Sequence, residues 1–190
     1  MPQPDIRPCE ACGLGRSLKI WRAVRRMKQS HAAALLKVSQ ATVSRWEAGA
    51  QIPTIGEQDA LRLLMSARLD SAGDHALGRL VAHSPAPVHL ICDLTHRLLA
   101  ASPGRTREWR VSPADLLGMP MWRYATPEIA AAEAALSDLG WFEPAPPAID
   151  VCTGSNDSLE VPIRPGGRRW VRLQLSDGSF VRLVETLGTA

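Results

Sequence analysis

Residues 29–53 read QSHAAALLKVSQATVSRWEAGAQIP and combine two short apolar patterns with one small, polar surface. Five apolar side chains have the spacing of a core shared by two helices, namely Ala33, Leu36, Val38, Val43 and Trp46. The opposite side of the second helix carries small or polar residues, namely Gln40, Ala41, Ser44 and Arg45. Small residues let a helix lie deep in the major groove, and Gln and Arg side chains can read adenine and guanine edges. The stretch therefore predicts a helix, a tight turn and a second helix that binds DNA.

Two residues beside these helices support the prediction, and a third, Lys37, departs from the ideal pattern. Ser39 precedes the second helix, so its hydroxyl can accept a hydrogen bond from a free backbone N–H. Gln29 begins the first helix, where its amide and the helix dipole can both meet a phosphate. Lys37 occupies the turn, a position that often takes a positive φ angle and favours glycine. We expect Lys37 to cost about 1 kcal/mol there.

The pattern resembles the helix-turn-helix domains of the Cro/repressor (XRE) family. In that family Q-x-x-x-A, V-S-Q-x-T-V-S-R-W-E and G-x-x-x-P follow one another at the spacing found here. The resemblance covers residues 16–66 and implies DNA-facing roles for Gln29, Ser39, Gln40, Ala41, Thr42, Ser44 and Arg45. It also implies a DNA-backbone contact by Gln51, and an ion pair between Glu47 and an arginine of the preceding helix, for which Arg22 is the candidate. Lys37 in place of glycine is the main departure, and an ordinary amphipathic helix pair is the alternative.

Positive charge gathers in the same part of the chain. The formal net charge is +3, but residues 1–66 hold 10 Lys or Arg against 5 Asp or Glu, and residues 67–190 hold 12 against 14. Between Arg16 and Trp46 there are eight basic residues and no acidic one. Such a segment can follow the phosphates of a nucleic acid, although a run of charge can also be an ordinary solvated surface. Because the run coincides with the motif, we expect it to face DNA.

The first 15 residues, MPQPDIRPCEACGLG, are rich in Pro and Gly and are predicted to form a flexible tail. Cys9 and Cys12 form a C-x-x-C pair in this tail, which is half of a tetrahedral zinc site. The other two cysteines, Cys92 and Cys152, are single residues in strand-like segments. We therefore predict no metal site, and Cys9 and Cys12 remain candidate metal ligands or a redox pair.

The first domain is expected to span residues 16–69. Helical spacing of apolar residues predicts a helix over residues 17–28 before the motif and another over residues 55–69 after it. Residues 70–87 are predicted to be a helical linker, with a short amphipathic helix over residues 74–83 that ends at the sequence SPAP. This helix either packs on one domain or pairs with its copy in a dimer through Leu77, Leu80 and Val81.

Strand patterns begin at Val88 and dominate the rest of the chain. The predicted strands are residues 88–93, 96–102, 148–152, 159–164, 169–175 and 180–187. Asp177 and Gly178 give a strong hairpin signal between the last two. Helix start and stop signals mark residues 112–118 and 127–140 between the early and late strands. The order predicts an α+β domain over residues 88–187, with an antiparallel sheet and helices on one face.

This order resembles a PAS domain. The resemblance rests on the first hairpin with Asp93 at its turn, on the D-L-L-G sequence of residues 115–118, and on the Arg-rich closing hairpin. It implies a role in dimerisation or in sensing a small ligand, which the sequence does not identify. His89 and His96 lie near strands but do not form a clear haem site, so no cofactor is predicted. Three tryptophans are expected in the core: Trp122, Trp141 and Trp170.

Catalysis and membrane insertion are not expected. The sequence has three scattered carboxylates in the second domain, Asp93, Asp115 and Glu160. None of them has a nucleophile or a metal ligand at the spacing of a known catalytic motif, and no phosphate-binding glycine loop is present. No apolar run approaches the roughly 18 residues that cross a bilayer, and the N-terminus does not resemble a signal peptide. We therefore expect a cytoplasmic protein that is not an enzyme and whose cysteines are reduced.

The sequence thus predicts a multidomain protein, with an all-α helix-turn-helix domain of four to five helices followed by an α+β PAS-like domain. The expected function is a sequence-specific DNA-binding transcriptional regulator, taken here as a repressor, that binds an inverted-repeat operator as a homodimer. One alternative is a regulator that responds to a small molecule or to redox state through the PAS-like domain. The other is an adaptor whose helix-turn-helix domain docks on protein.

Overall fold

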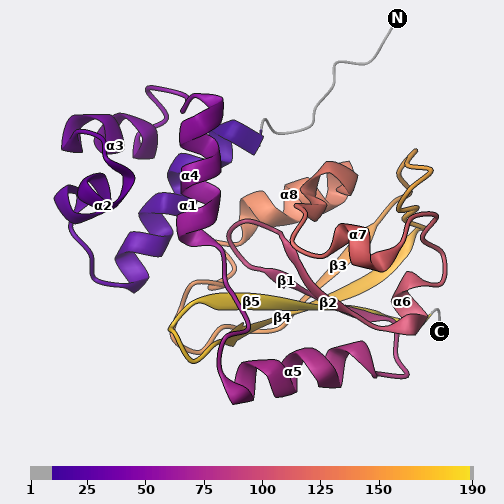
Figure 1. The fold of residues 1–190 in the computed structure, drawn as a ribbon. Coiled ribbons are helices and arrows are strands. Elements are labelled where there is room, and N and C mark those ends of the chain that lie inside the picture. The colour runs from indigo at the N-terminus through magenta and orange to yellow at the C-terminus, as the bar shows by residue number, and fades with distance from the viewer. Residues whose placement is uncertain (1–9, 189–190) are drawn as a thin grey trace, which may run out of the picture. The chain divides into compact units, whose positions relative to one another are not determined.

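The computed structural model describes residues 10–188, with side chains from residue 13 onward, and divides into two compact units. The first, here called the helical unit, ends at Ser66, and the second, the sheet unit, begins at Ala67 (Figure 1). This division assigns all of the predicted linker, residues 70–87, to the sheet unit. No helix in the described part of the chain is long and apolar enough to span a bilayer.

The helical unit contains four helices between residues 10 and 66: α1 (Glu10–Val24), α2 (Gln29–Leu36), α3 (Gln40–Glu47) and α4 (Ile55–Met65). Its centre is formed by side chains that are at most 5% exposed, namely Leu18, Trp21, Val43, Trp46, Leu61 and Met65. These residues recur at helical spacing within α1, α3 and α4, so each of these three helices turns an apolar face towards the shared centre. Leu36 and Val38, predicted in the same core, are half-buried.

The first helix differs in both of its ends from the predicted helix over residues 17–28. It begins at Glu10, so residues 10–15 of the predicted flexible tail are helical. The reason is close packing, because Leu14 is buried and a Cβ atom on Gly15 would lie 1.9 Å from the carbonyl oxygen of Trp46. The helix ends at Val24, and Arg26 takes a φ of 50° in the turn that follows. Tertiary packing thus outweighs the low helix propensity of Gly13 and Gly15.

The sheet unit is built on five antiparallel strands in the order β2-β1-β5-β4-β3. They are β1 (Val88–Cys92), β2 (Leu98–Ala101), β3 (Ile149–Thr153), β4 (Gly166–Gln174) and β5 (Phe180–Thr186). The predicted α+β class and antiparallel sheet are therefore confirmed. The turn between β4 and β5 contains Gly178 at a φ of 79°, at the hairpin that the Asp-Gly pair predicted.

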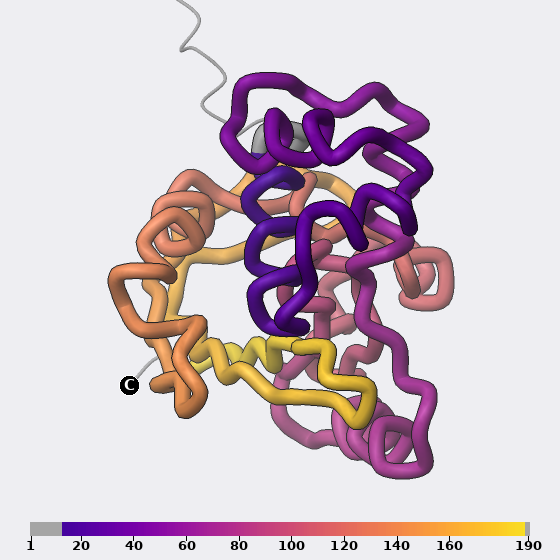
Figure 2. The backbone as a smooth tube through the Cα atoms, turned by 90° about the vertical axis from the view of Figure 1, so that its left-hand side faces the viewer, coloured from indigo at the N-terminus to yellow at the C-terminus, as the bar shows by residue number. Residues whose placement is uncertain are grey.

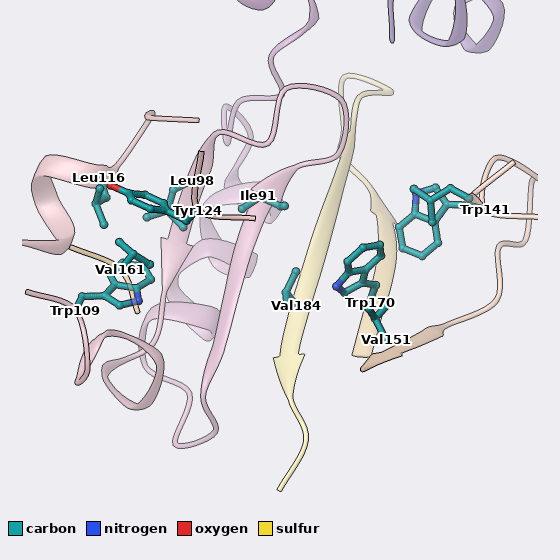
Figure 3. Packing of buried hydrophobic residues seen from close by; sticks show 11 residues of the cluster. Ile91, Leu98, Trp109, Leu116, Tyr124, Trp141, Val151, Val161, Trp170 and Val184 are labelled. Carbon is teal, nitrogen blue, oxygen red and sulfur yellow. The ribbon is translucent and has the colours of Figure 1, made fainter. Parts of the chain in front are cut away.

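Helices cover both faces of the sheet, whereas the sequence predicted them on one face. One face carries α6 (Pro103–Thr106), α7 (Pro113–Leu116), the 3-10 helix η1 (Met121–Tyr124) and α8 (Pro127–Ala135). The side chains that pack together on this face are shown in Figure 3: Ile91, Leu98, Trp109, Leu116, Tyr124, Leu136, Trp141, Val151, Val161, Trp170 and Val184. The helix α5 (Ala72–Ala82) lies on the other face, where Val81 packs with Leu90 and Val181.

The packing of α5 corresponds to one of the two alternatives predicted for the helix over residues 74–83, namely that it packs on one domain. Val81 is buried and Leu77 packs against the sheet, while Leu80 is 72% exposed, so the three residues do not form one free stripe. Buried Asp74 accepts hydrogen bonds from the backbone N–H and the hydroxyl of Ser176, at 3.2 and 2.6 Å. Figure 2 shows the β4–β5 turn, in yellow, beside the start of α5. The helix belongs to the sheet unit because its apolar side packs on the sheet and its first turn is hydrogen-bonded to the β4–β5 turn.

Two other predicted elements also differ. Residues 159–164 do not form a strand, because the side chain of Asn156 replaces a neighbouring strand. Its amide donates to the carbonyl oxygens of Tyr124 and Val161, at 2.8 and 3.1 Å, and its oxygen accepts from the N–H of Ile163 at 2.8 Å. Val161 and Ile163 are still buried, whereas Leu159, which shares their alternating spacing, is 86% exposed. The helix predicted over residues 127–140 ends at Ala135 and continues as turns.

Candidate functional site

The turn between α2 and α3 has the backbone conformation that the sequence predicted. Lys37 takes φ 55° and ψ 40°, the left-handed region in which glycine carries no steric cost. The hydroxyl of Ser39 accepts a hydrogen bond from the N–H of Thr42 at 3.0 Å and so caps α3. The cap and the left-handed residue together set the direction in which α3 leaves the turn.

Buried and exposed residues alternate along α3 as its apolar spacing predicts. Val43 and Trp46 are 0% and 2% exposed and fix the helix to the core. The outer side carries the exposed residues Gln40, Ala41, Ser44 and Arg45. The structure thus brings four of the predicted DNA-facing residues onto one solvent-exposed side of one short helix. Ser39 is exposed beside them, and Thr42 is half-buried.

Gln51 lies against the outer side of α3. Its side-chain oxygen accepts a hydrogen bond from Nε of Arg45 at 2.9 Å. The Nη2 of the same arginine lies 3.4 Å from the hydroxyl of Thr42. The sequence assigned Gln51 a contact with the DNA backbone, and the structure adds that it orients the guanidinium of Arg45.

A bidentate ion pair connects the end of α3 to α1. Nε and Nη2 of Arg22 each lie 2.8 Å from a different carboxylate oxygen of Glu47, and the two side chains are 16% and 4% exposed. Arg22 also donates to the carbonyl oxygen of Met27 at 2.6 Å. Burial alone would raise the pKa of Glu47, but the hydrogen bonds from Arg22 and Gln29 hold that pKa below its ordinary value. The pair is therefore ionised at neutral pH.

Gln29, for which a phosphate contact is predicted, has a hydrogen-bond partner within the helical unit. Its amide nitrogen donates to Oε2 of Glu47 at 2.9 Å, so the side chain is held by the protein at the start of α2. Gln29 therefore has a structural partner within the helical unit.

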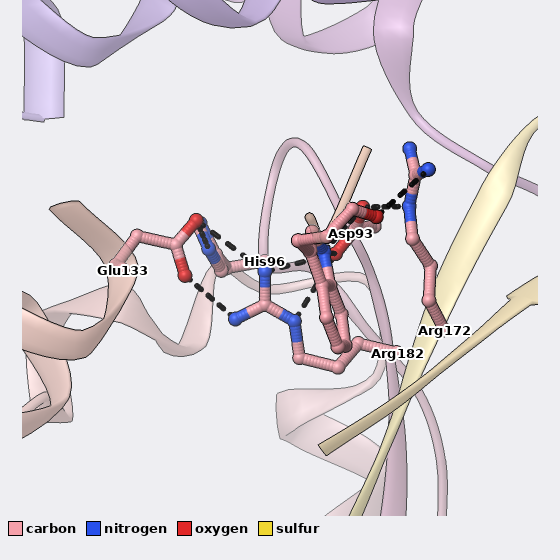
Figure 4. Close-up of polar contacts among 6 residues, drawn as sticks. Asp93, His96, Glu133, Arg172 and Arg182 are labelled. Carbon is pink, nitrogen blue, oxygen red and sulfur yellow. Dashed lines mark hydrogen bonds and ion pairs between the residues drawn. The ribbon is translucent and has the colours of Figure 1, made fainter. Parts of the chain in front are cut away.

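The sheet unit contains a buried polar cluster that the sequence did not reveal (Figure 4). Asp93, which is 2% exposed, accepts from Nε of Arg172 at 2.8 Å and from Nη2 of Arg182 at 2.8 Å. The indole N–H of Trp141 donates to the same carboxylate at 3.0 Å. Arg182 also donates to Glu133 at 2.6 Å, and Nε2 of His96 lies 3.3 Å from that carboxylate. Burial opposes the charge on Arg182, but Glu133 and Asp93 outweigh it and raise the pKa of the guanidinium.

One signal could have revealed part of this cluster. Arg168, Trp170 and Arg172 alternate along β4, so they share one face of the strand, and tryptophan on that face indicates the core. Asp93 was read as a turn residue and as a scattered carboxylate. Its partners are 79 and 89 positions away in the chain, which no local pattern can show.

A cavity of about 80 Å³ opens on the same face of the sheet. One water needs only about 10–15 Å³, so the cavity has room for a small molecule. Most of its wall is apolar and includes Ile91, Met121, Trp122, Ile129, Val161, Ile163, Trp170 and Val184. Its polar wall consists of His89, His96, Arg105, Arg168, Arg182 and the Tyr124 side chain. Trp122, predicted in the core, stacks on His96 with 4.7 Å between ring centroids and lines this cavity, whereas Trp141 and Trp170 are buried in the core.

The structure does not assemble a metal site from the residues it describes. Among residues 13–188, no group of three or more His, Cys, Asp or Glu side chains is placed to hold a metal ion. Cys92 is buried and accepts a hydrogen bond from the N–H of Ala67 at 3.2 Å, and Cys152 is exposed. Cys9 and the side chain of Cys12, the candidate metal ligands, lie outside the described part of the chain.

Comparison with known proteins gives matches in fold only. No protein-family model matches the sequence, and no curated protein matches it. Among solved structures, the PAS domain of an HTR-like protein from Haloarcula marismortui has a TM-score of 0.42 and 14% identity over 60% of this chain and 90% of that one. A PAS domain from a two-component sensor histidine kinase has a TM-score of 0.41 and 11% identity over 60% and 95%. An RNA-binding light-oxygen-voltage receptor has a TM-score of 0.42 and 11% identity over 94% and 59%.

Proposed function

We propose that this chain is a sequence-specific DNA-binding transcriptional regulator of the helix-turn-helix type. The observation that carries the proposal is the outer side of α3, where Gln40, Ala41, Ser44 and Arg45 are all exposed while Val43 and Trp46 fix the helix from behind. A helix of this kind can enter the major groove, where Gln pairs with adenine and Arg with guanine. Ala41 and Ser44 are small enough to let the backbone approach the base edges.

The charges of the helical unit support this choice. Six basic residues of the acid-free run are exposed, namely Arg16, Lys19, Arg26, Lys28, Lys37 and Arg45. Glu47, the first acidic residue after the run, is neutralised by Arg22. A phosphate backbone would therefore meet basic side chains without a free carboxylate from this segment, which favours nucleic acid over a basic or neutral protein partner.

The regulator is proposed to bind as a two-fold dimer. One α3 helix reads too few base pairs to select a site from a genome, and a second copy doubles the length of the site. A symmetric dimer would place two α3 helices in successive major grooves, about 34 Å apart, on an inverted repeat. The sheet unit is proposed to supply both the dimer contact and the control of DNA binding. The reason is that the outer surface of α3 is proposed to contact DNA and so cannot also form the dimer contact.

The decisive experiment is selection of random duplex DNA by the purified chain, followed by sequencing. We expect enrichment of one inverted repeat whose half-sites are about 10 base pairs apart. Replacing Arg45 by Ala should change the enriched bases, whereas Arg107→Ala removes the same charge from an exposed site in the sheet unit and should leave the motif intact. Selection that enriches no motif would contradict the proposal and favour the adaptor that docks on protein.

Duplex RNA of the same sequence serves as a second control. The major groove of A-form RNA is too deep and narrow for an α-helix to read its bases. We therefore expect weak, sequence-independent binding of the duplex RNA that disappears as salt is raised.

A further inference from the structure

Four arginines of the sheet unit, which lie at the Asp93 cluster and at the cavity, fall into two groups. In the first group, Arg172 and Arg182 are matched by Asp93 and Glu133 at distances of 2.6–2.8 Å. The second group is Arg105, on α6, and Arg168, on β4, and both line the cavity. No carboxylate within ion-pair distance of either of these two guanidinium groups is found in the described residues. The cavity therefore has an excess of positive charge.

Arg105 is the clearest case of a charge without a partner. Its Nε is buried and makes no hydrogen bond to the part of the chain that the structure describes. The guanidinium lies 5.6 Å from the ring centroid of Trp109, so an aromatic face supports one side of it. Burial, together with the nearby charge of Arg168, lowers the pKa of Arg105 to about 10, and the group is still charged at neutral pH.

Arg168 is buried, at 8% exposure, and is held by backbone oxygens. It donates to the carbonyl oxygens of Gly167 and Arg164, at 2.9 and 3.2 Å. Glu108 acts on both Arg105 and Arg168 through its charge, but its carboxylate is paired with Nε of Arg164 at 3.0 Å. The surrounding chain thus fixes the position of Arg168 without neutralising it.

His89 adds a neutral polar group to the same wall. Its Nδ1 is buried and without a hydrogen-bond partner among the described residues. Burial, with Arg105, Arg168 and Arg182 nearby, holds the pKa of His89 well below its ordinary value, so the ring is neutral at pH 7. A neutral imidazole can donate or accept one hydrogen bond inside the cavity.

We propose that the cavity of the sheet unit binds a small organic carboxylate, with the carboxylate group held by Arg105 and Arg168 and the apolar body of the ligand against Ile91, Val161 and Trp170. Guanidinium groups match carboxylates in geometry, since a guanidinium can donate two parallel hydrogen bonds to the two oxygens of one carboxylate. A buried, unpaired charge is unfavourable, and a bound anion would remove that cost. The largely apolar wall selects an organic anion over a strongly hydrated inorganic one, because inorganic phosphate would lose its water against aliphatic and indole side chains.

The test uses the full chain and pairs of probes that differ in charge but little in shape. Benzoate is compared with benzamide, and isobutyrate with isobutyramide, by calorimetry and by thermal unfolding without DNA. We expect each acid to raise the melting temperature by about 2–5 °C at roughly ten times its Kd, and each amide to bind at least about tenfold more weakly. Inorganic phosphate is expected to give no saturable shift.

Three variants separate the site from general effects of charge. Arg105→Met and Arg168→Met keep much of the side-chain volume and should abolish the saturable shift with the acids. Arg107→Met removes an exposed arginine two positions from Arg105 and should bind the acids as the parent does. Without ligand, Arg105→Met should unfold at the same temperature as the parent or higher, because a buried unpaired charge has been removed.

Several results would overturn the proposal. Failure of both acids to bind at up to about 10 mM, equal binding of acids and amides, or equal loss in all three variants would each do so. If Arg105→Met does not fold, Arg105→Lys replaces it, and this variant must weaken both acids while retaining a native melting curve. Binding of the carboxylate depends only on the sheet unit. An added effect of the acids on DNA affinity would rest on the proposed regulator function, so failure of that effect alone would leave the binding site in place.

Discussion

Arg22 and Glu47 are joined by two hydrogen bonds of 2.8 Å each, across 25 positions of the chain. This contact connects α1 to the last residue of α3, the helix whose outer side is proposed to enter the major groove. The ion pair lies behind the exposed face and not on it, so its expected role is to hold α3 in position.

The first prediction concerns this pair. Replacing Glu47 by Ala should lower the stability of the helical unit by about 2 kcal/mol, because Arg22 and Gln29 lose a largely buried partner. Thermal unfolding of the variant measures the change. Asp59→Ala is the matched control, since Asp59 pairs with Arg62 at 3.3 Å but is 70% exposed, and its loss should have little effect. Equal effects of the two substitutions would show that the buried pair contributes no more to stability than the exposed pair does.

The same pair predicts a dependence on pH. The folded-state pKa of Glu47 lies below its ordinary value of 4.5, so its contribution is present above that value and is lost as the pH falls through the folded-state pKa. The difference in melting temperature between the parent and Glu47→Gln should therefore be constant above pH 5 and shrink below about pH 4.5. A difference that grows on acidification would contradict the assignment.

The close packing of the same two helices, α1 and α3, predicts opposite effects for two glycines of α1. Gly15→Ala should destabilise the protein by about 2–4 kcal/mol, because its Cβ atom would lie 1.9 Å from the carbonyl oxygen of Trp46. Gly13→Ala meets nothing within 4 Å and should stabilise α1 by up to about 1 kcal/mol. Urea unfolding of both variants measures these changes, and destabilisation by Gly13→Ala would show that the register of α1 is wrong.

The outer side of α3 predicts a loss of discrimination between DNA sites. Gln40→Ala and Arg45→Ala should each weaken binding to the selected operator by about 1–3 kcal/mol and to random DNA much less. Gln51→Ala should weaken operator binding through Arg45, to which it is hydrogen-bonded at 2.9 Å. In a double-mutant cycle, Gln51→Ala should therefore have a smaller effect once Arg45 is Ala. Additive losses would mean that Gln51 acts independently of Arg45.

The buried cluster of the sheet unit predicts a large effect at one carboxylate. Asp93→Ala should destabilise the unit by about 3–5 kcal/mol, because Arg172 and Arg182 keep their charges in the core and lose an acceptor. Asp150, which pairs with Arg169 on the surface at 2.7 Å, is the control, and Asp150→Ala should leave the melting temperature nearly unchanged. Similar melting curves for both variants would mean that the Asp93 cluster contributes little.

The division of roles between the two units predicts the behaviour of fragments. A fragment ending at Ser66 keeps the core of the helical unit and should be monomeric in analytical ultracentrifugation. Its affinity for an inverted-repeat operator should be far below that of the full chain, because two half-sites are no longer bound together. A dimeric fragment with full affinity would place the dimer contact in the helical unit.

The sequence by itself determined the features that depend on neighbouring residues. Apolar spacing located α2, α3 and all five strands, the residue type and position of Ser39 predicted the cap, and the turn predicted the positive φ of Lys37. The contact of Arg22 with Glu47 was expected only through the resemblance to a family, since nothing in the spacing of the residues implies it. In each case the information lies within a few positions or in a pattern shared with other chains.

The tertiary structure alone decided the features that depend on distant residues. The early start of α1 requires Gly15 to meet Trp46, and the place of α5 requires Asp74 to meet Ser176. Asp93 becomes the centre of a buried cluster only when β4 and β5 bring two arginines to it. The cavity likewise exists only where α6 and the sheet bring Arg105 and Arg168 to one wall. Burial and unpaired charge are properties of this packing, and local propensity and periodicity contain no information about them.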